Sequence, residues 1–285
     1  MPMDIILITG MSGSGKSVAL RALEDSGFFC VDNLPPELLA DVVHLQTRQR
    51  NRLLAIAIDV RSAESLHLLP EQLKSLAREH LRVKTLFLDA STPTLVHRYS
   101  ETRRRHPLAK HSTVDREQDL IEAIEQEREL LGVLRDGSHV IDTSLLRSAQ
   151  LQTWIKGLMD TPLAPMTVVF ESFGFKRGVP MDADFVFDAR MLPNPYYEPG
   201  LRELTGRDAP VQAFLQQAAL VQKLQAHIAS FVLDWVPLIE ADHRPYVTIA
   251  IGCTGGQHRS VYLVEQLAAQ MPSRWPTLRR HRDLP

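Results

Sequence analysis

Residues 10–17 have the spacing G-x-x-x-x-G-K-S, which is typical of a loop that holds a polyphosphate. The glycines of such a loop let it curl until successive backbone N–H groups point inward at the phosphates. Lys16 is expected to neutralise β- and γ-phosphate oxygens, and Ser17 to offer its hydroxyl to Mg²⁺. The predicted loop consists of Gly10, Met11, Ser12, Gly13, Ser14, Gly15, Lys16 and Ser17.

A magnesium ion at such a loop usually has a second carboxylate at the end of another strand. Asp59 and Asp89 each end an apolar run and each suit this role. Asp59 is favoured, because the segment V-R-S that follows it adds a cation beside the phosphates. The alternative for either aspartate is a cap on the following helix. The predicted catalytic residues are Lys16, Ser17 and Asp59, with Ser17 and Asp59 as the metal ligands.

Two segments of opposite charge follow these strands. Residues 97–111 carry a net charge of +4, from Arg98, Arg103, Arg104, Arg105 and Lys110 against Glu101. Crowded like charges repel unless an anion joins them, so these arginines predict a phosphate-clamping lid, with a plain basic surface as the alternative. Residues 115–129 carry seven acidic side chains against two arginines, a net charge of −5, and predict a solvated helix surface.

Residues 253–260, C-T-G-G-Q-H-R-S, form a second candidate anion site between a strand pattern and a helix pattern. The C-x5-R-S spacing resembles the loop of cysteine phosphatases, in which backbone N–H groups and an arginine fork surround an oxyanion. Gly252 stands where a histidine usually precedes that cysteine, so phosphate binding without covalent catalysis is favoured. The predicted cradle consists of Cys253, Thr254, Gly255, Gly256, His258, Arg259 and Ser260.

The last thirteen residues, S-R-W-P-T-L-R-R-H-R-D-L-P, carry four arginines against Asp283, a net charge of +3, and one tryptophan, Trp275. Clustered arginine beside an aromatic ring suits contact with an RNA backbone and stacking of a base. The alternative is a basic tail without a function. The predicted RNA contacts are Arg274, Arg279, Arg280 and Arg282.

The elements that must position these residues follow from the apolar pattern. Apolar runs at 4–9, 28–31, 53–59, 83–89 and 138–144 alternate with helical patterns, which is typical of a doubly wound parallel sheet. The stretch 157–165 contains two prolines and a glycine and predicts a linker. We therefore predict an α/β protein with a P-loop kinase-like domain over 1–156 and a smaller α/β domain over 166–285.

The composition is that of a globular protein: 285 residues, 44% hydrophobic and 23% charged, a length that favours two domains. The net charge of −2 means that a nucleic acid would have to be attracted by local basic patches. The chain has two cysteines, Cys30 and Cys253, no charged-then-apolar leader and no apolar run of about 20 residues. These features predict a cytoplasmic protein without structural disulfides and without a membrane partner.

Six stretches together resemble the RapZ (YvcJ) family of nucleotide-binding proteins, the RNase adapter proteins of bacteria. The resemblance runs through both predicted domains, from Met3 to about Arg282. The stretches are "GMSGSGKSVALRALEDSGFFCVDNLP", "IDVRS", "RRRHPL", "VFESFGFKRGVPMDADFVFDAR", "LPNPYY" and "AIGCTGGQHRSVYLVEQLA".

The resemblance implies slow hydrolysis of ATP and GTP, with residues 10–17 as the ATP loop. It assigns a second segment to GTP, namely Asp59, Val60, Arg61 and Ser62. In enterobacterial members it further implies a second domain that binds small regulatory RNA and glucosamine-6-phosphate. Those members present the RNA to ribonuclease E and so set the level of glucosamine-6-phosphate synthase. A homo-oligomer is expected on the same ground.

Three functions therefore stay open at the level of sequence. The leading hypothesis is a sensor and adapter that couples nucleotide, phosphorylated metabolite and RNA. The second is a small-molecule or nucleotide kinase, for which Asp32 on the second strand and the arginines near residue 100 are typical. The third is a cysteine phosphatase that uses Cys253.

Overall fold

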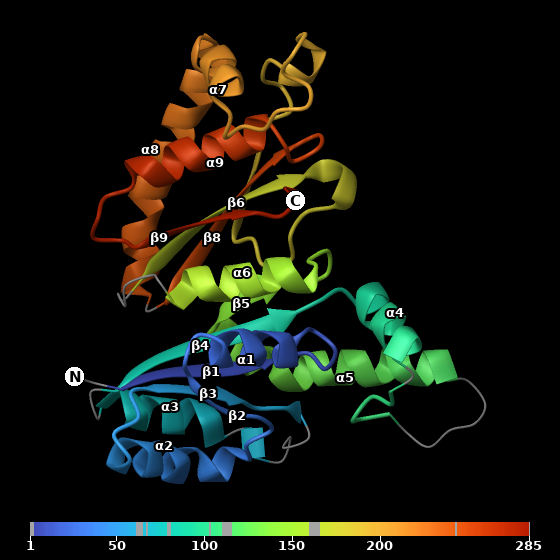
Figure 1. Cartoon of the computed structure of the whole chain (residues 1–285), viewed down its shortest axis with the longest axis vertical. Helices are drawn as coiled ribbons and strands as arrows, with labels where there is room; N and C mark the ends of the chain where they lie inside the picture. Colours follow the sequence, from blue (N-terminus) through green and yellow to red (C-terminus); the bar gives the residue numbers. More distant parts are fainter. Residues whose placement is uncertain are drawn as a thin grey trace. The chain divides into compact units, whose positions relative to one another are not determined.

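The computed structural model describes residues 3–60, 65–66, 68–78, 81–102, 104–109, 116–159, 166–242 and 244–284. The chain divides into two compact units, Met1–Lys156 and Gly157–Pro285, each of which is built on its own sheet (Figure 1). None of the helices in the described ranges combines the length and the apolar composition needed to span a bilayer.

The first unit contains, within the described ranges, a parallel sheet of five strands in the order β2-β3-β1-β4-β5. Its central strand carries the run I-I-L-I, and all four side chains are buried. Continuous apolar strands of this kind are needed wherever helices cover both faces of a sheet. The strands are β1 (Asp4–Gly10), β2 (Phe29–Val31), β3 (Leu53–Ala57), β4 (Arg82–Asp89) and β5 (His139–Asp142).

Right-handed crossovers distribute the helices over the two faces of this sheet. The chain runs from β1 to β2 toward one edge, and its later crossovers to β3, β4 and β5 run in the opposite direction. α1 therefore covers one face, and α2, α3 and α5 cover the other (Figure 1). The helices are α1 (Lys16–Glu24), α2 (Leu39–Arg48), α3 (Leu69–Arg78), α4 (Thr92–Thr102), α5 (Arg116–Asp136) and α6 (Ser148–Met159).

The second unit contains a smaller parallel sheet, with four strands in the order β7-β8-β6-β9 among the residues described. All eight residues of β6 are buried, and Phe170, Ile249 and Leu263 lie in the core beneath the helices. The strands are β6 (Thr167–Gly174), β7 (Phe185–Asp188), β8 (Tyr246–Cys253) and β9 (Thr277–His281). The helices are α7 (Ala209–Gln216), α8 (Ala219–Ala241) and α9 (Arg259–Gln270).

The predicted fold class is confirmed: a P-loop kinase-like parallel sheet is followed by a smaller α/β unit with a second parallel sheet. The segment near the C-terminus is not the basic tail that the sequence left open as an alternative. Residues 277–281 form β9, which pairs with β6 in parallel register from Val168↔Thr277 to Ser172↔His281. The arginines of this segment are therefore part of a sheet.

Asp89, at the end of β4, has a carboxylate that forms structural ion pairs. Its side chain is 1% exposed, and Arg128 and Arg135 of α5 lie 2.7 and 3.4 Å from its two oxygens. Oδ1 also accepts a hydrogen bond from the N–H of Ala90. Asp89 therefore ties α5 to the sheet, which leaves Asp59 as the better placed of the two predicted metal ligands.

We expect Asp89→Ala to lower the free energy of unfolding by about 2–4 kcal/mol, because it leaves two partly buried guanidinium groups without their anion. Urea unfolding followed by circular dichroism measures the loss. The control is Asp136→Ala, a change at an exposed position of α5, the helix that carries Arg128 and Arg135. It should alter the free energy of unfolding by less than about 0.5 kcal/mol. Equal stability of the two variants would contradict a structural role for Asp89.

Candidate functional site

Both predicted anion sites lie where neighbouring strands send the chain in opposite directions. In the first unit the chain leaves β1 toward one edge of the sheet and leaves β3 toward the other. In the second unit the same reversal separates β6 from β8. Crevices at such strand ends are the usual ligand sites of open parallel sheets. Residues 10–17 continue β1, and residues 253–260 continue β8.

The first loop has the curled backbone that its sequence predicts. Gly10, Gly13 and Gly15 have φ angles of +127°, +86° and +109°, which glycine adopts without strain. A Cβ at Gly10 would lie only 2.1 Å from the carbonyl oxygen of Leu88, so no side chain fits there. α1 begins at Lys16, directly after this turn, and the unpaired N–H groups of a first helical turn favour an anion.

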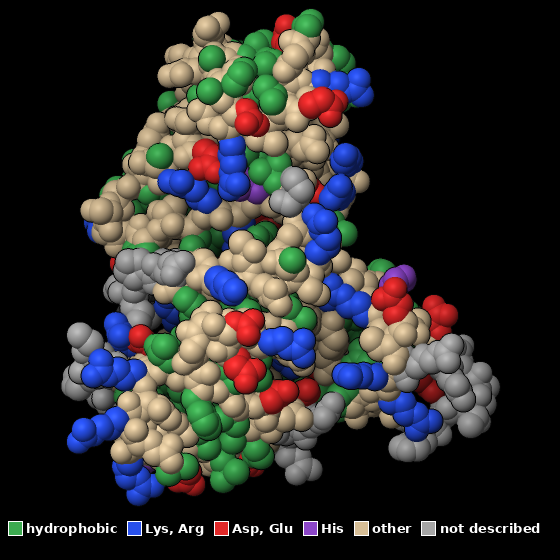
Figure 2. All heavy atoms as spheres, in the orientation of Figure 1, with side chains coloured by type: hydrophobic (Ala, Val, Ile, Leu, Met, Phe, Trp, Pro, Cys, Tyr) green, Lys and Arg blue, Asp and Glu red, His purple; other side chains and the backbone are tan. Residues whose placement is uncertain are grey.

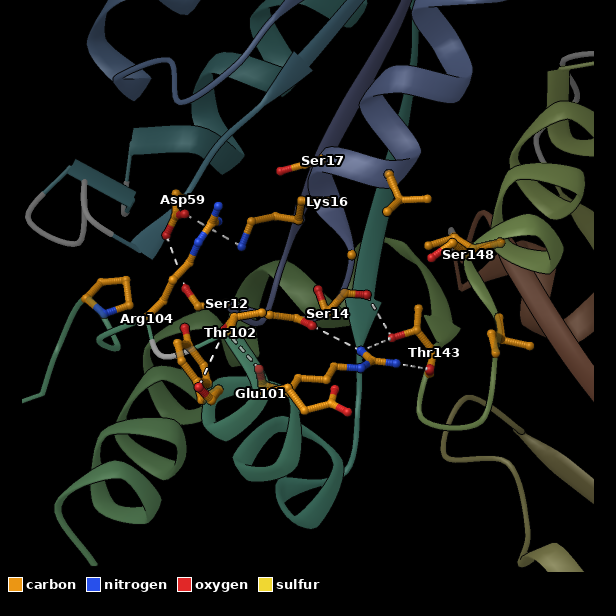
Figure 3. A pocket seen from close by; sticks show the side chains of 18 of the residues that line it. Ser12, Ser14, Lys16, Ser17, Asp59, Glu101, Thr102, Arg104, Thr143 and Ser148 are labelled. Carbon is orange, nitrogen blue, oxygen red and sulfur yellow. Dashed lines mark hydrogen bonds and ion pairs between the residues drawn. The ribbon is translucent and has the colours of Figure 1, made fainter. Parts of the chain in front are cut away.

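A cavity of about 660 Å³ opens over this loop (Figure 3). Its walls come from α4 with the segment that follows it, and from the turn between β5 and α6. Cationic side chains outnumber carboxylates around it, so the cavity is electrostatically positive before a ligand enters. The charged residues that line it are Lys16, Asp59, Arg98, Glu101, Arg104, Arg105 and Arg147.

Lys16, Ser17 and Asp59 come together at this cavity, as their motif predicts. Nζ of Lys16 donates to the carbonyl oxygen of Gly10 at 2.6 Å and lies 3.9 Å from Oδ2 of Asp59 (Figure 3). Mg²⁺ prefers oxygen ligands and usually takes one or two from the protein and the rest from phosphates and water. Among the described residues, no group of three or more histidine, cysteine or acidic side chains could hold a metal unaided. The donors at Ser17 and Asp59 fit Mg²⁺ that binds together with phosphate.

The predicted arginine clamp divides into a structural part and an available part. Arg98 donates from Nη1 to the carbonyl of Gly13 and from Nη2 to the carbonyl of Thr143, so it fastens the loop to the turn after β5. Arg104 and Arg105 are exposed, line the cavity, and make no ion pair or hydrogen bond in the described part of the chain. These two arginines are free to meet an anion.

Glu127 is the exception to the predicted solvated surface of the acidic segment: its side chain is fully buried, whereas Glu117, Glu122, Glu125 and Glu129 are exposed. The Glu127 carboxylate accepts hydrogen bonds from the backbone N–H and the hydroxyl of Ser12, and it contacts Nε2 of His106 at 2.9 Å. Sequence reasoning missed this residue. The available signal was its spacing, since Glu127 falls in the apolar stripe of α5 between the buried Ile124 and Leu131.

For some predicted residues of the first unit, the structure gives no evidence of a role in the site. Arg61, Ser62 and Arg103 lie outside the described residues. Val60 is described and buried. Asp32, on which the kinase hypothesis depends, is exposed and is absent from the described lining of the cavity.

The second loop holds its cysteine inside a network of short contacts. Sγ of Cys253 accepts the N–H of Gly256 at 3.3 Å and lies 3.2 Å from the hydroxyl of Ser260. Two glycines elsewhere let the loop pack this closely. A Cβ at Gly174 would lie 2.7 Å from the carbonyl carbon of Gly255, and a Cβ at Gly206 would lie 2.3 Å from the carbonyl oxygen of His258. Close backbone packing at Gly174 and Gly206 therefore supports the curled form of the loop.

Arg259 does not form the predicted fork around an oxyanion. Nη1 donates to the carbonyl oxygens of Arg190 and Leu192 at 2.7 and 3.1 Å, and Nη2 donates to the hydroxyl of Thr254 at 3.2 Å. The protein's own oxygens thus occupy the donors that a phosphatase would offer to phosphate. Nε of Arg259 is buried and has no hydrogen-bond partner in the described part of the chain. Of the five N–H donors of Arg259, three are engaged by these oxygens, which leaves the Nε–H and one N–H of Nη2. The phosphatase hypothesis therefore loses its main support.

Two of the four predicted RNA contacts are wrong. The side chains of Arg280 and Arg282 are only 3% exposed, so neither can reach a nucleic acid. Arg280 lies 3.7 Å from Asp182, and burial lowers the pKa of its guanidinium while Asp182 opposes that shift. Arg282 donates to the carbonyls of Gly174 and Gly178. Both arginines are structural ties of the second sheet.

The other two predicted RNA contacts stay accessible. Arg274 and Arg279 are exposed, and the Arg274 guanidinium lies 3.6 Å from the ring centroid of Trp275. The indole is itself 2% exposed and donates to Glu240, so it cannot stack on a base as predicted. On the face drawn in Figure 2, basic side chains lie in scattered groups beside acidic ones. Any attraction of nucleic acid must come from such a local group.

The strand order, the glycine-rich turn and the cavity define the first unit as a P-loop protein of the kinase-like class, linked to a second parallel α/β unit. Residues 3–162 match the family model for the RapZ-like N-terminal domain, and residues 166–285 match that for the RapZ C-terminal domain. The chain belongs to the RapZ family, in agreement with the resemblance seen in its sequence.

Two similar proteins are named "Nucleotide-binding protein". The one from Paracidovorax citrulli is 60% identical over 99% of this chain and 97% of its own length. The one from Albidiferax ferrireducens is 59% identical over 99% and 95%. Among solved structures, a shikimate kinase from Bacteroides thetaiotaomicron aligns with 55% of this chain over 97% of its own length, at 15% sequence identity and a TM-score of 0.39. A shikimate kinase from Acinetobacter baumannii matches 56% and 93%, at 18% identity and a TM-score of 0.38.

Glu265, on the helix that follows the second loop, collects three basic side chains. Arg207, His281 and Arg279 lie 2.9, 3.0 and 3.2 Å from its oxygens. The hydrogen bond with His281 lowers the pKa of Glu265 to about 2, the bond with Arg207 acts in the same direction, and burial opposes both. Burial in turn lowers the pKa of His281. This cluster anchors α9 to β9.

We expect Glu265→Gln to destabilise the protein near pH 7 and to lose this effect in acid. A carboxylate whose folded pKa is about 2, against an ordinary value of 4.5, stabilises the fold above pH 4.5 and stops doing so as the pH falls toward 2. Urea unfolding of the wild type and of Glu265→Gln between pH 3 and 7 measures the difference in their free energies of unfolding, which should become smaller in acid. The exposed Glu203→Gln change is the control. A difference that stays constant with pH would contradict the ionic role.

Proposed function

We propose that the protein is a nucleotide-dependent regulatory adapter. It binds ATP and GTP with Mg²⁺ at residues 10–17, hydrolyses them slowly, and couples the bound nucleotide to a phosphorylated metabolite and to RNA. The observation that carries this proposal is the positive cavity over the first loop, which is lined by Lys16, Asp59, Arg104 and Arg105. Neither of these arginines makes an ion pair or hydrogen bond within the described residues. That about 60%-identical relatives are named nucleotide-binding proteins supports the same choice.

The first unit's own residues account for binding and for slow turnover. Lys16 exchanges its bond with the Gly10 carbonyl for phosphate oxygens, while Arg104 and Arg105 balance the remaining charge. Mg²⁺ held by Ser17 and Asp59 would supply further charge neutralisation at the phosphates. The described lining offers few bases to activate water. Its two carboxylates are Asp59, which faces Lys16, and Glu101, which lies beside His97. We therefore expect hydrolysis far below the 1–100 s⁻¹ of kinases.

The second unit supports a phosphorylated ligand at residues 253–260. The curled backbone, the first turn of α9 and the unpartnered Nε of Arg259 are donors suited to one phosphoryl group. Family resemblance makes glucosamine-6-phosphate, or a similar phosphosugar, the metabolite we propose. The same resemblance suggests a small regulatory RNA that is passed to ribonuclease E. The accessible Arg274 and Arg279 are the RNA contacts we retain.

Phosphoryl transfer to a small acceptor is the second candidate function. The observation that favours it is the pair Arg104 and Arg105 at the cavity, which have no partner among the described residues, because kinases clamp a transferring phosphoryl group with such side chains. The two functions differ in their product. Labelled ATP incubated with phosphorylatable metabolites yields only inorganic phosphate, slowly, if the protein is an adapter, and a labelled metabolite if it is a kinase.

We expect Lys16→Ala to weaken ATP binding by about ten- to a hundredfold, because a charge-assisted hydrogen bond to phosphate contributes roughly 1.5–3 kcal/mol. Isothermal titration with ATP and Mg²⁺ measures this change. Lys156→Ala, an exposed lysine of α6, is the control and should bind as the wild type does. A wild-type protein without measurable affinity for ATP or GTP would overturn the proposed function.

We expect the double change Arg274→Ala/Arg279→Ala to weaken binding of a structured RNA and to reduce the salt dependence by about two phosphate contacts. Filter binding at several salt concentrations measures both. Arg202→Ala, another exposed arginine of the second unit, is the control. Saturating glucosamine-6-phosphate should change the RNA affinity if the two ligands are coupled. Unchanged binding by the double variant would remove these arginines from the RNA site.

A further inference from the structure

A buried carboxylate lies behind the first half of the phosphate loop. The Glu127 oxygens accept the backbone N–H of Ser12 at 2.9 and 3.0 Å and its hydroxyl at 2.7 Å. The Ser12 hydroxyl is farther, 3.4 Å, from Oδ1 of Asp59, so its single proton goes to Glu127. Both donors of Ser12 are thus engaged by Glu127 and are withheld from a phosphate in the cavity that Ser12 lines.

The third donor to this carboxylate is His106, and its tautomer follows from its neighbours. The N–H of Leu108 donates to Nδ1 of His106 at 3.1 Å, so Nδ1 carries no proton. Nε2 then carries the ring proton and donates it to Glu127 at 2.9 Å. The side chains of His106 and Glu127 are both fully buried. Glu127 is therefore a fully satisfied anion, held by three donors from two distant segments.

The same histidine connects the available arginines to the loop. His106 directly follows Arg104 and Arg105, and its ring packs on Tyr99, with 5.3 Å between the ring centroids. The Tyr99 ring in turn lies against Gly13, where a Cβ would meet it at 3.4 Å. The arginine segment and the first half of the loop are thus joined both through Glu127 and through Tyr99.

We propose that Glu127 and His106 are positioning residues of the nucleotide site, and that the buried Glu127 carboxylate lowers the preference of the loop for nucleoside triphosphate over diphosphate. Ser12 lies beside Asp59, which in turn faces Lys16, the residue that reaches the outer phosphates. The negative charge behind Ser12 therefore acts most strongly on the terminal phosphate. This inference rests on the proposed nucleotide site and is independent of RNA and of the metabolite.

The experiment separates the charge of Glu127 from its shape. Dissociation constants for ATP and ADP, each with Mg²⁺, are measured by titration for the wild type, Glu127→Gln and Glu127→Asp. Glutamine keeps an acceptor for Ser12 but removes the charge, so the ATP-to-ADP affinity ratio should rise by about tenfold, the size expected for one like charge in a partly screened site. Aspartate keeps the charge but is shorter, so both affinities should fall together and the ratio should stay near the wild-type value.

A control variant, a second test and a stability measurement accompany this experiment. Glu129→Gln, an exposed change two residues along α5, should leave both affinities unchanged. His106→Ala should weaken the effect of Arg104→Ala on ATP affinity, because without His106 the segment that carries Arg104 is no longer held at the cavity. A double-mutant cycle of the two changes measures this coupling. Thermal unfolding of every variant identifies losses that come from folding alone.

The outcomes distinguish the inference from the proposed function. A raised ATP-to-ADP ratio in Glu127→Gln, together with coupling between His106 and Arg104, supports it. A wild type that binds both nucleotides, while Glu127→Gln binds them in an unchanged ratio, overturns this inference and leaves the proposed function standing. A wild type that binds neither nucleotide overturns both.

Discussion

The order of the parallel strands is the constraint on which both candidate sites depend. Each sheet contains two neighbouring strands that the chain leaves in opposite directions, β1 and β3 in the first and β6 and β8 in the second. Right-handed connections that leave neighbouring strands in opposite directions pass over opposite faces of the sheet, so a crevice forms between the ends of those strands. Both glycine-rich loops continue a strand of such a pair. Close backbone contacts, at Gly10 in one loop and beside Gly255 in the other, then hold their curled form.

Buried and half-buried carboxylates collect hydrogen-bond donors from segments around these loops. Asp89 receives Arg128 and Arg135, Glu127 receives Ser12 and His106, and Glu265 receives Arg207, His281 and Arg279. Each carboxylate joins segments far apart in the chain and is satisfied by several donors, which is the condition for burying a charge without a large penalty. The acidic residues are thus the structural partners of the sites, although the ligands we propose are anions.

The arginines accordingly fall into two classes with different duties. Arg98, Arg259 and Arg282 donate mainly to oxygens of the protein, and Arg280 forms an ion pair with Asp182, so these arginines hold loops and strands in place. The second class is exposed and includes Arg104, Arg105 and Arg147 at the cavity and Arg274 and Arg279 on the second unit, although Arg279 also pairs with Glu265. These exposed side chains are the better placed to contribute charge to a bound phosphate or nucleic acid. A count of arginines therefore overstates the electrostatic attraction available to ligands.

Glycine spacing and apolar periodicity act between residues close in the chain, so the parallel sheets and the loop at residues 10–17 could be predicted from the sequence. The family followed from the resemblance of six stretches. Which charged groups are used to hold the fold together depends on long-range contacts and is visible only in the folded chain. Glu127 meets Ser12 across 115 positions, and Arg282 meets Gly174 across 108. Hydrogen-bond partners at such separations leave no local pattern, so Arg282, predicted to touch RNA, lies in the interior. The burial of Glu127 had a local signal in the apolar stripe of α5, but its partners Ser12 and His106 did not.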